Sequence, residues 1–183
     1  MNLTYYPKSV FAFCLFLILY ACSPMKPGGS SEASKSGSNL FETFYVGEGN
    51  TQYFIKPIVF ENENKEQFIL DFTFKYKDNL NEKMILKASL LSNLLTKELD
   101  QVIFTNGKIK KNIDLENIKL LFSERDKKLF LSRFSMESNL SQFKQLFNSP
   151  NWKIKIKGFK PFTPKNSTHK KISRLNYSIF ELM

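Results

Sequence analysis

Apolar and polar residues alternate along much of the chain after residue 40, a pattern typical of β-strands with one buried face. The clearest example is FILDFTFKY, in which Phe68, Leu70, Phe72 and Phe74 fall on one side. The opposite side carries Ile69, Asp71, Thr73 and Lys75. Because successive side chains of a strand point to opposite faces, this stretch predicts a strand that covers a core.

Neighbouring segments predict further strands. In FIKPIVF the same alternation places Phe54, Lys56, Ile58 and Phe60 on one face. A strand or short helix is expected at Phe41–Val46, and the GEGN step after it predicts a hairpin connection to TQYFIKPIVF. The segment MILKASLLSNLL, residues 84–95, fits both helical and strand spacing, and we favour a strand as far as about Leu91.

Two more hairpins and one helix follow. QVIFTNGKI has an Asn-Gly turn between apolar runs, and IKLLFSERDKKLFLSRFSM has a polar centre between two others. Ser138-Asn139 can cap a helix whose apolar face is Leu140, Phe143, Leu146 and Phe147, and which ends at Asn148-Ser149-Pro150.

The last quarter of the chain returns to strands. NWKIKIKGF alternates strictly, and SRLNYSIFELM is expected to be a final strand. Seven or eight short strands with one short α-helix indicate a mainly β fold. We predict an antiparallel β-sandwich or a barrel-like domain.

The N-terminus has a different character. The apolar run from Ser9 to Ala21 is 13 residues long, shorter than the about 20 residues that a membrane-spanning helix needs. Its length and the preceding Lys8 are those of a secretory signal. Leu19-Tyr20-Ala21-Cys22 resembles the lipobox of bacterial lipoproteins, and the relaxed form with Tyr20 is similar to those of spirochaetes. The composition, rich in Lys, Asn, Ile and Phe, is similar to that of Borrelia-type proteins.

The resemblance implies cleavage before Cys22 and acylation of its sulfur and new amine. The following segment is rich in Ser and Gly and almost without apolar residues, so it is expected to be a flexible tether. We therefore predict a signal peptide at residues 1–21, a lipidated cysteine and tether at 22–39, and one β-rich domain at 40–183. Since Cys14 lies in the signal, the mature domain would have no thiol for disulfides or metal binding.

Charge is concentrated near the C-terminus. The whole chain has a net charge of +10, and residues 138–183 contain nine Lys and Arg but only one acidic residue, Glu181. Alternation in NWKIKIKGF places Trp152, Ile154 and Ile156 in the core and a row of lysines outside. A basic strip that suits an anionic ligand is therefore predicted from Lys153, Lys155, Lys157, Lys160, Lys170, Lys171 and Arg174, with Lys165 beside them.

Catalytic and metal sites are not indicated. His169 is the only histidine and is expected to be a solvated loop residue. The pairs Glu61/Glu63 and Asp114/Glu116 lie in polar segments where both members would be solvated alike. Asp71 is expected in a cross-strand ion pair. A cleft that held Asp71 or His169 beside a second titratable group would favour an enzyme, but no enzyme activity, metal or cofactor is predicted.

Three classes of function remain. The first is a lipid-anchored cell-envelope binding protein that engages a polyanion or anionic lipid through the basic strip. The alternative is a periplasmic structural or assembly accessory that binds an envelope protein through sheet edges or the helix at 139–148. An unrecognised hydrolase is the third. Nucleic acid is not an expected partner for an exported protein whose aromatics point inward. Ser23, in place of the Asp typical of inner-membrane retention, favours the outer membrane.

Overall fold

The computed structural model describes residues 39–46, 50–76 and 83–182. All of them belong to the larger of two compact units of the chain, residues 34–183. The predicted signal peptide, Cys22 and the tether as far as Ser38 lie outside the described residues. In the part that is described, no helix is both long enough and apolar enough to cross a membrane.

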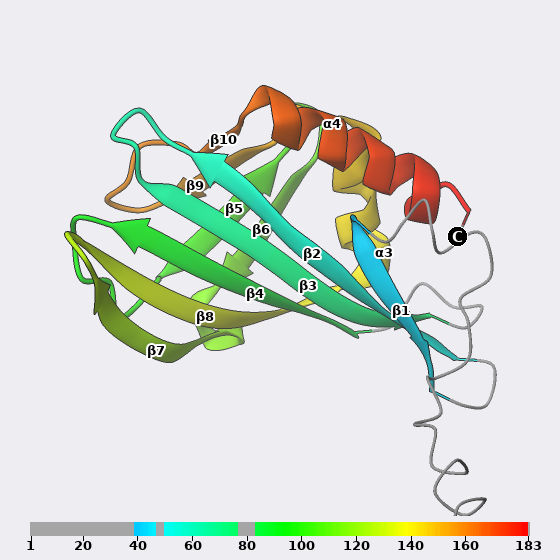
Figure 1. Cartoon of the computed structure of the whole chain (residues 1–183), viewed down its shortest axis with the longest axis horizontal. Helices are drawn as coiled ribbons and strands as arrows, with labels where there is room; N and C mark the ends of the chain where they lie inside the picture. The colour runs from blue at the N-terminus through cyan, green and yellow to red at the C-terminus, as the bar shows by residue number, and fades with distance from the viewer. Residues whose placement is uncertain (1–38, 47–49, 77–82, 183) are drawn as a thin grey trace, which may run out of the picture. The chain divides into compact units, whose positions relative to one another are not determined.

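Two antiparallel sheets make up the domain (Figure 1). The larger has the order β1-β2-β3-β4-β8-β7, with the short β10 paired to β2 as its seventh strand, and the smaller has the order β6-β5-β9. The strands are β1 (Phe41–Tyr45), β2 (Thr51–Glu61), β3 (Gln67–Tyr76), β4 (Lys83–Ser92), β5 (Gln101–Thr105), β6 (Lys110–Asp114), β7 (Ile118–Asp126), β8 (Leu129–Asn139), β9 (Lys153–Ile156) and β10 (Thr163–Pro164).

Helical segments complete the described part. They are the 3-10 turns η1 (Leu115–Asn117) and η2 (Gln145–Asn148), the α-helices α3 (Leu140–Lys144) and α4 (Asn166–Leu175), and the π-helical turn η3 (Asn176–Phe180). Helix α3 begins at the predicted cap, because the Asn139 side chain accepts a hydrogen bond from the Ser141 backbone N–H. All four predicted apolar positions of α3 and η2 are buried.

The core lies between the two sheets and under the helices. It is rich in phenylalanine, and Trp152 contacts rings from both sheets, with ring centroids 6.0 Å from Phe60 of β2 and 6.4 Å from Phe104 of β5. Its ring also lies 4.7 Å from that of Phe147 in η2. The fold is therefore mainly β and sandwich-like, and the sheets do not close into a barrel.

Several sequence predictions are confirmed. Phe68, Leu70, Phe72 and Phe74 are all buried in β3. The ambiguous segment after residue 83 is the strand β4. All three predicted hairpins are present as the antiparallel pairs β1–β2, β5–β6 and β7–β8, although residues 47–49 of the GEGN step lie outside the described residues.

The prediction for β2 is wrong in one half of the strand. Ile55, Ile58 and Phe60 are buried, whereas Phe54 is exposed and Lys56 is only partly buried. The cause is a β-bulge between Ile55 and Ile58, at the position of Pro57, which has no N–H to donate to a ladder. The extra residue moves the side chains before it to the opposite face.

The predicted final strand is also wrong. Residues 166–180 form α4 and η3, and the buried residues Ile172, Leu175 and Ile179 recur at helical spacing. Phe180 follows Ile179 into the core, where its ring lies 4.3 Å from that of Phe147. The domain thus has two α-helices in its described part, where one was expected.

We predict that Phe180→Ala destabilises the domain by about 3–5 kcal/mol, because a buried aromatic ring would be replaced by a cavity. Tyr177→Ala in the same turn is the matched control, since the Tyr177 residue is 74% exposed. Its effect should stay within about 0.5 kcal/mol. Urea denaturation measures both free energies of unfolding. If Phe180→Ala and Tyr177→Ala lowered the free energy of unfolding equally, the helical packing of this segment would be contradicted.

Candidate functional site

The basic strip is built on β9, at the edge of the smaller sheet. Strand β9 pairs antiparallel with β5, with Lys153 opposite Thr105 and Lys155 opposite Ile103. Ile154 and Ile156 are buried, as is Trp152 just before the strand, while Lys153, Lys155 and Lys157 are exposed. The predicted alternation is confirmed, and it follows from the apolar side chains facing the core.

A groove of about 630 Å³ runs beside these lysines. Its lining combines two ammonium groups and an imidazole with amide and hydroxyl groups, and no Asp or Glu contributes to it. Such a set offers hydrogen-bond donors and positive charge, which is the combination that recognises an anion. The lining residues are Thr105, Asn106, Gly107, Asn151, Trp152, Lys153, Lys155, Thr163, Pro164 and His169.

One rim of the groove is the β5–β6 turn, which Asn106 holds in place. Its buried side-chain oxygen accepts hydrogen bonds from the backbone N–H groups of Lys108 (3.1 Å) and Ile109 (2.8 Å). Its Nδ2 donates to the carbonyl of Leu146 in η2, at 3.0 Å. Gly107 adopts a positive φ of 89°, which glycine allows without strain. The rim is therefore fixed to the helical layer.

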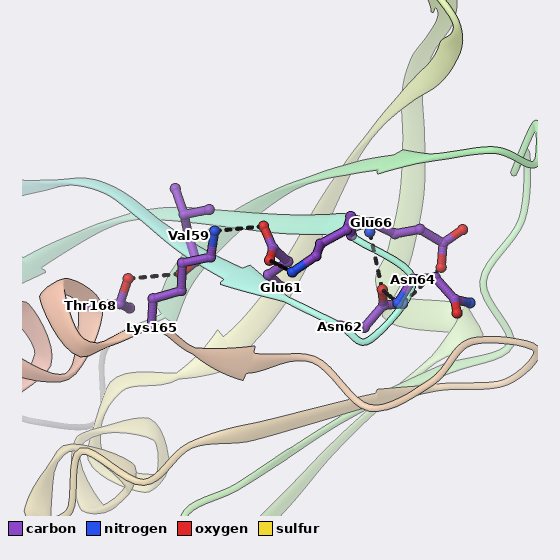
Figure 2. Close-up of polar contacts among 8 residues, drawn as sticks. Val59, Glu61, Asn62, Asn64, Glu66, Lys165 and Thr168 are labelled. Atoms are coloured by element: carbon purple, nitrogen blue, oxygen red, sulfur yellow. Dashed lines mark hydrogen bonds and ion pairs between the residues drawn. The ribbon is translucent and has the colours of Figure 1, made fainter.

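The opposite wall comes from β10 and the start of α4. Backbone hydrogen bonds of 2.9 Å join Phe162 to Ile154 in both directions. Figure 2 shows Lys165 bound to Glu61 (2.7 Å) and the Thr168 hydroxyl donating to the Val59 carbonyl (2.9 Å). These contacts attach the wall to β2.

His169 lies on this wall, and its backbone N–H donates to the Lys165 carbonyl at 2.9 Å. It is a half-buried helical residue that lines the groove, so the prediction of a solvated loop histidine is wrong. The sequence did not predict that His169 lines a groove, because it did not predict the helix that carries this residue.

Glu61 is distinguished from Glu63 by the same contacts. Its side chain is only 12% exposed and also lies 3.5 Å from the Lys65 ammonium, whereas Glu63 is exposed. The expectation that the two would be solvated alike is therefore wrong. The hydrogen bond from Lys165, reinforced by the charges of Lys165 and Lys65, lowers the pKa of Glu61 despite some desolvation. Beside it, the buried Asn62 donates to Glu66 at 2.7 Å and holds the β2–β3 turn (Figure 2).

A second groove, of about 640 Å³, lies on the other side of Lys155. Here Lys157 contacts Asp100 at 2.9 Å, and this hydrogen bond and charge raise the pKa of Lys157. Since Asp100 neutralises Lys157 locally, this groove is less positive than the first. Its other lining residues are Gln101, Ile103, Ile156, Phe159 and Pro161.

The rest of the predicted strip is dispersed. Lys160, Lys170 and Arg174 are exposed but line neither groove. Lys171 donates to the Pro57 carbonyl at 2.7 Å, and burial together with the charge of Lys56 lowers its pKa. The structure therefore brings Lys153 and Lys155 together with His169, and leaves the helical residues of the strip outside this groove.

Lys110 is a cation that sequence reasoning missed. It lies opposite Thr105 on β6, and Thr105 lies opposite Lys153, so the three form one row across the smaller sheet. At about 4.8 Å between strands, the Cα atoms of Lys110 and Lys153 are about 10 Å apart. The register of the β5–β6 hairpin could have placed Lys110 beside Thr105. The pairing of β5 with β9, which adds Lys153 to the row, joins strands far apart in the sequence and cannot be predicted from a local pattern.

Asp71 forms the expected cross-strand ion pair. Its partner is Arg133 of β8, at 2.6 Å, and Arg133 also donates to Ser89 of the intervening β4 at 2.7 Å. Asp71 lines a smaller hollow of about 270 Å³ on the outer face of the larger sheet, with Glu42, Lys56, Lys87 and Arg133 among its neighbours. The hollow therefore has charges of both signs that largely neutralise one another.

The first groove holds His169 beside Lys153 and Lys155, the arrangement that would favour an enzyme, and its lining has no carboxylate to orient the imidazole. Among the described residues, no three His, Cys, Asp or Glu side chains gather as a metal site would require. No protein-family model, curated protein or solved structure matches the chain.

We predict that Glu61 contributes to stability in a pH-dependent way. Because its pKa is lowered on folding, the contribution is present above the ordinary glutamate pKa and lost as the pH falls through the lowered value. Glu61→Gln should therefore flatten the loss of stability between about pH 5 and 3. Urea midpoints across this range measure it.

Glu63→Gln is the control for this experiment, because Glu63 is exposed. The stability of Glu63→Gln should depend on pH as that of the wild type does. If the stability of Glu61→Gln also showed the wild-type pH dependence, the contact between Glu61 and Lys165 would not hold the groove wall in solution.

Proposed function

We propose that this protein is a lipid-anchored cell-envelope protein that binds an anionic ligand in the β9 groove. The observation that carries the proposal is the lining itself, in which Lys153, Lys155 and His169 face one hollow without an acidic residue. The concentration of Lys and Arg in residues 138–183 supports it, since acidic residues are nearly absent there. The ligand class is a polyanion of the envelope or its surroundings, or an anionic lipid headgroup.

The anchor in this proposal is Cys22. The lipobox-like residues 19–22 and the Ser- and Gly-rich segment that follows support an acylated cysteine with a tether, and Ser23 favours the outer membrane. Two or more acyl chains give stable membrane attachment, which a single chain does not. A domain held in this way would meet anionic headgroups or polymers near the membrane surface.

An assembly accessory that binds an envelope protein is the alternative. It was expected to use the helix at 139–148 or a sheet edge. The apolar residues of that helix are buried in the domain's own core, so they are not available to a partner. The alternative therefore relies on the sheet edges, and both outer strands of the larger sheet, β1 and β7, expose apolar side chains.

We predict that Lys153→Gln with Lys155→Gln lowers the affinity for heparin about tenfold, because two ammonium contacts of about 0.5–1 kcal/mol each would be lost. Wild-type binding should weaken steeply as salt rises, and this salt dependence should be shallower in the variant. Titration at several salt concentrations measures both. Vesicles of anionic and of neutral lipid, tested in parallel, separate a headgroup from a polymer.

The matched control is Lys160→Gln with Lys170→Gln, which removes the same charge from exposed positions outside both grooves. It should keep most of the affinity, as should Lys157→Gln, whose charge Asp100 already neutralises. Equal losses in the two double variants would indicate attraction by net charge alone and contradict binding in the groove.

We predict that Cys22→Ser releases the protein from the detergent phase in Triton X-114 partitioning and abolishes labelling with radioactive palmitate. Cys14→Ser should change neither, because Cys14 lies in the predicted signal peptide. Palmitate labelling of Cys22→Ser at the level of the wild type would contradict lipidation at this position.

A further inference from the structure

Strand β7 is an open edge of the larger sheet. It is the last strand in the order and pairs with β8 on one side, and no other strand of the described part pairs with its second side. Three consecutive residues on it are exposed, namely Leu120 (40%), Leu121 (49%) and Phe122 (43%). An open edge with apolar side chains is a template for pairing with another strand.

A β-bulge decides which β7 side chains share a face. Leu120 lies opposite Phe134, but Phe122 lies opposite Arg133, so Leu121 is an extra residue. On β8 the residues Ser132, Phe134 and Met136 are buried, which places Leu131, Arg133 and Ser135 on the outer face. Lys119, Phe122 and Glu124 are paired with these three and therefore also face outward.

This bulge makes β7 complementary to itself. In a symmetric antiparallel pair of edge strands, outward residues must lie opposite outward residues. With Lys119 opposite Glu124 of a second copy, this condition holds at both ends, and Leu121 lies opposite Phe122 between them. Opposite charges in cross-strand pairs are stabilising, and the two-fold axis supplies two such pairs.

Neighbouring registers fail on the same criteria. A shift of one residue places Lys119 opposite Ser123 or Arg125. Both are on the inward face, and Arg125 would add a repulsion between like charges. In a regular strand Lys119 and Glu124, five positions apart, would face opposite sides, so the favourable register exists only because of the bulge.

We propose that β7 binds the β7 edge of a second copy of this chain, so that the two larger sheets become continuous. The loop before β5 extends the apolar surface. The Ser123 hydroxyl lies 3.3 Å from the Thr96 carbonyl, which brings the exposed Leu94 and Leu95 close to the strand. Burial of these side chains in a dimer would remove an apolar edge of the sheet from water.

Charge reversal tests this register. In the full chain, solubilised in a mild detergent, Lys119→Glu and Glu124→Lys should each weaken the dimer at least about tenfold, because each places two like-charge pairs at the interface. Mixing the two variants in equal amounts should restore a dimer, since both cross-strand pairs then join an acidic side chain of one copy to a basic side chain of the other. The double variant K119E/E124K should dimerise as the wild type does. Analytical ultracentrifugation measures each dissociation constant.

Lys128→Glu is the control, because Lys128 is exposed in the turn beyond β7 and should leave the dimer unchanged. Restoration by mixing also separates the proposed pairing from association of the lipid anchors and from misfolding of a variant. A wild-type protein that stays monomeric up to about 1 mM would overturn the proposal, as would single variants that dimerise normally or a mixture that does not recover. A monomer would leave β7 to a strand of a different protein.

Discussion

The packing of Trp152 is the interaction on which the rest of the structure depends. Its ring contacts the larger sheet through Phe60, the smaller sheet through Phe104 and the helical layer through Phe147. Its indole N–H donates to the Leu146 carbonyl at 2.9 Å, so the buried nitrogen has a partner. Because Trp152 comes directly before β9, its inward position fixes the face of every residue in that strand and turns Lys153 outward.

Rigid supports surround the lysines on both sides. Asn106 binds the turn on one side to η2, and the contacts of Lys165 and Thr168 bind the other wall to β2. The same region of β2 carries the bulge at Pro57, whose carbonyl accepts from Lys171. Side chains of α4 thus satisfy carbonyl groups on the part of β2 that lies between its pairings with β1 and β10. A groove with fixed walls loses little conformational entropy when a ligand binds.

Local patterns predicted the strands and hairpins but not the features that depend on distant partners. The alternation in β3 is regular because the strand itself has no extra residue and pairs continuously with β4, whereas the bulge in β2 is visible only in its pairing with β3. The final helix was missed because its periodicity begins upstream, at Thr168 and Ile172, and the segment from Ser173 alone fits a strand. The outward lysines of β9 were predictable from alternation. The positions of His169 and Lys110 were not, since His169 lines the groove through the fold of α4 and Lys110 joins the row of Lys153 through the pairing of β5 with β6 and β9.

The pairing of β9 with β5 also has a consequence for the order of folding. The meander from β1 to β4 joins strands that are adjacent in sequence, so its contacts close short loops. The smaller sheet is complete only when β9 crosses back to β5 over the whole of β7, β8 and α3. Closing so long a loop is entropically costly, which places this step late. The groove beside β9 would then be the last part of the domain to form, and a chain stopped before β9 would have most of its larger sheet but not this groove.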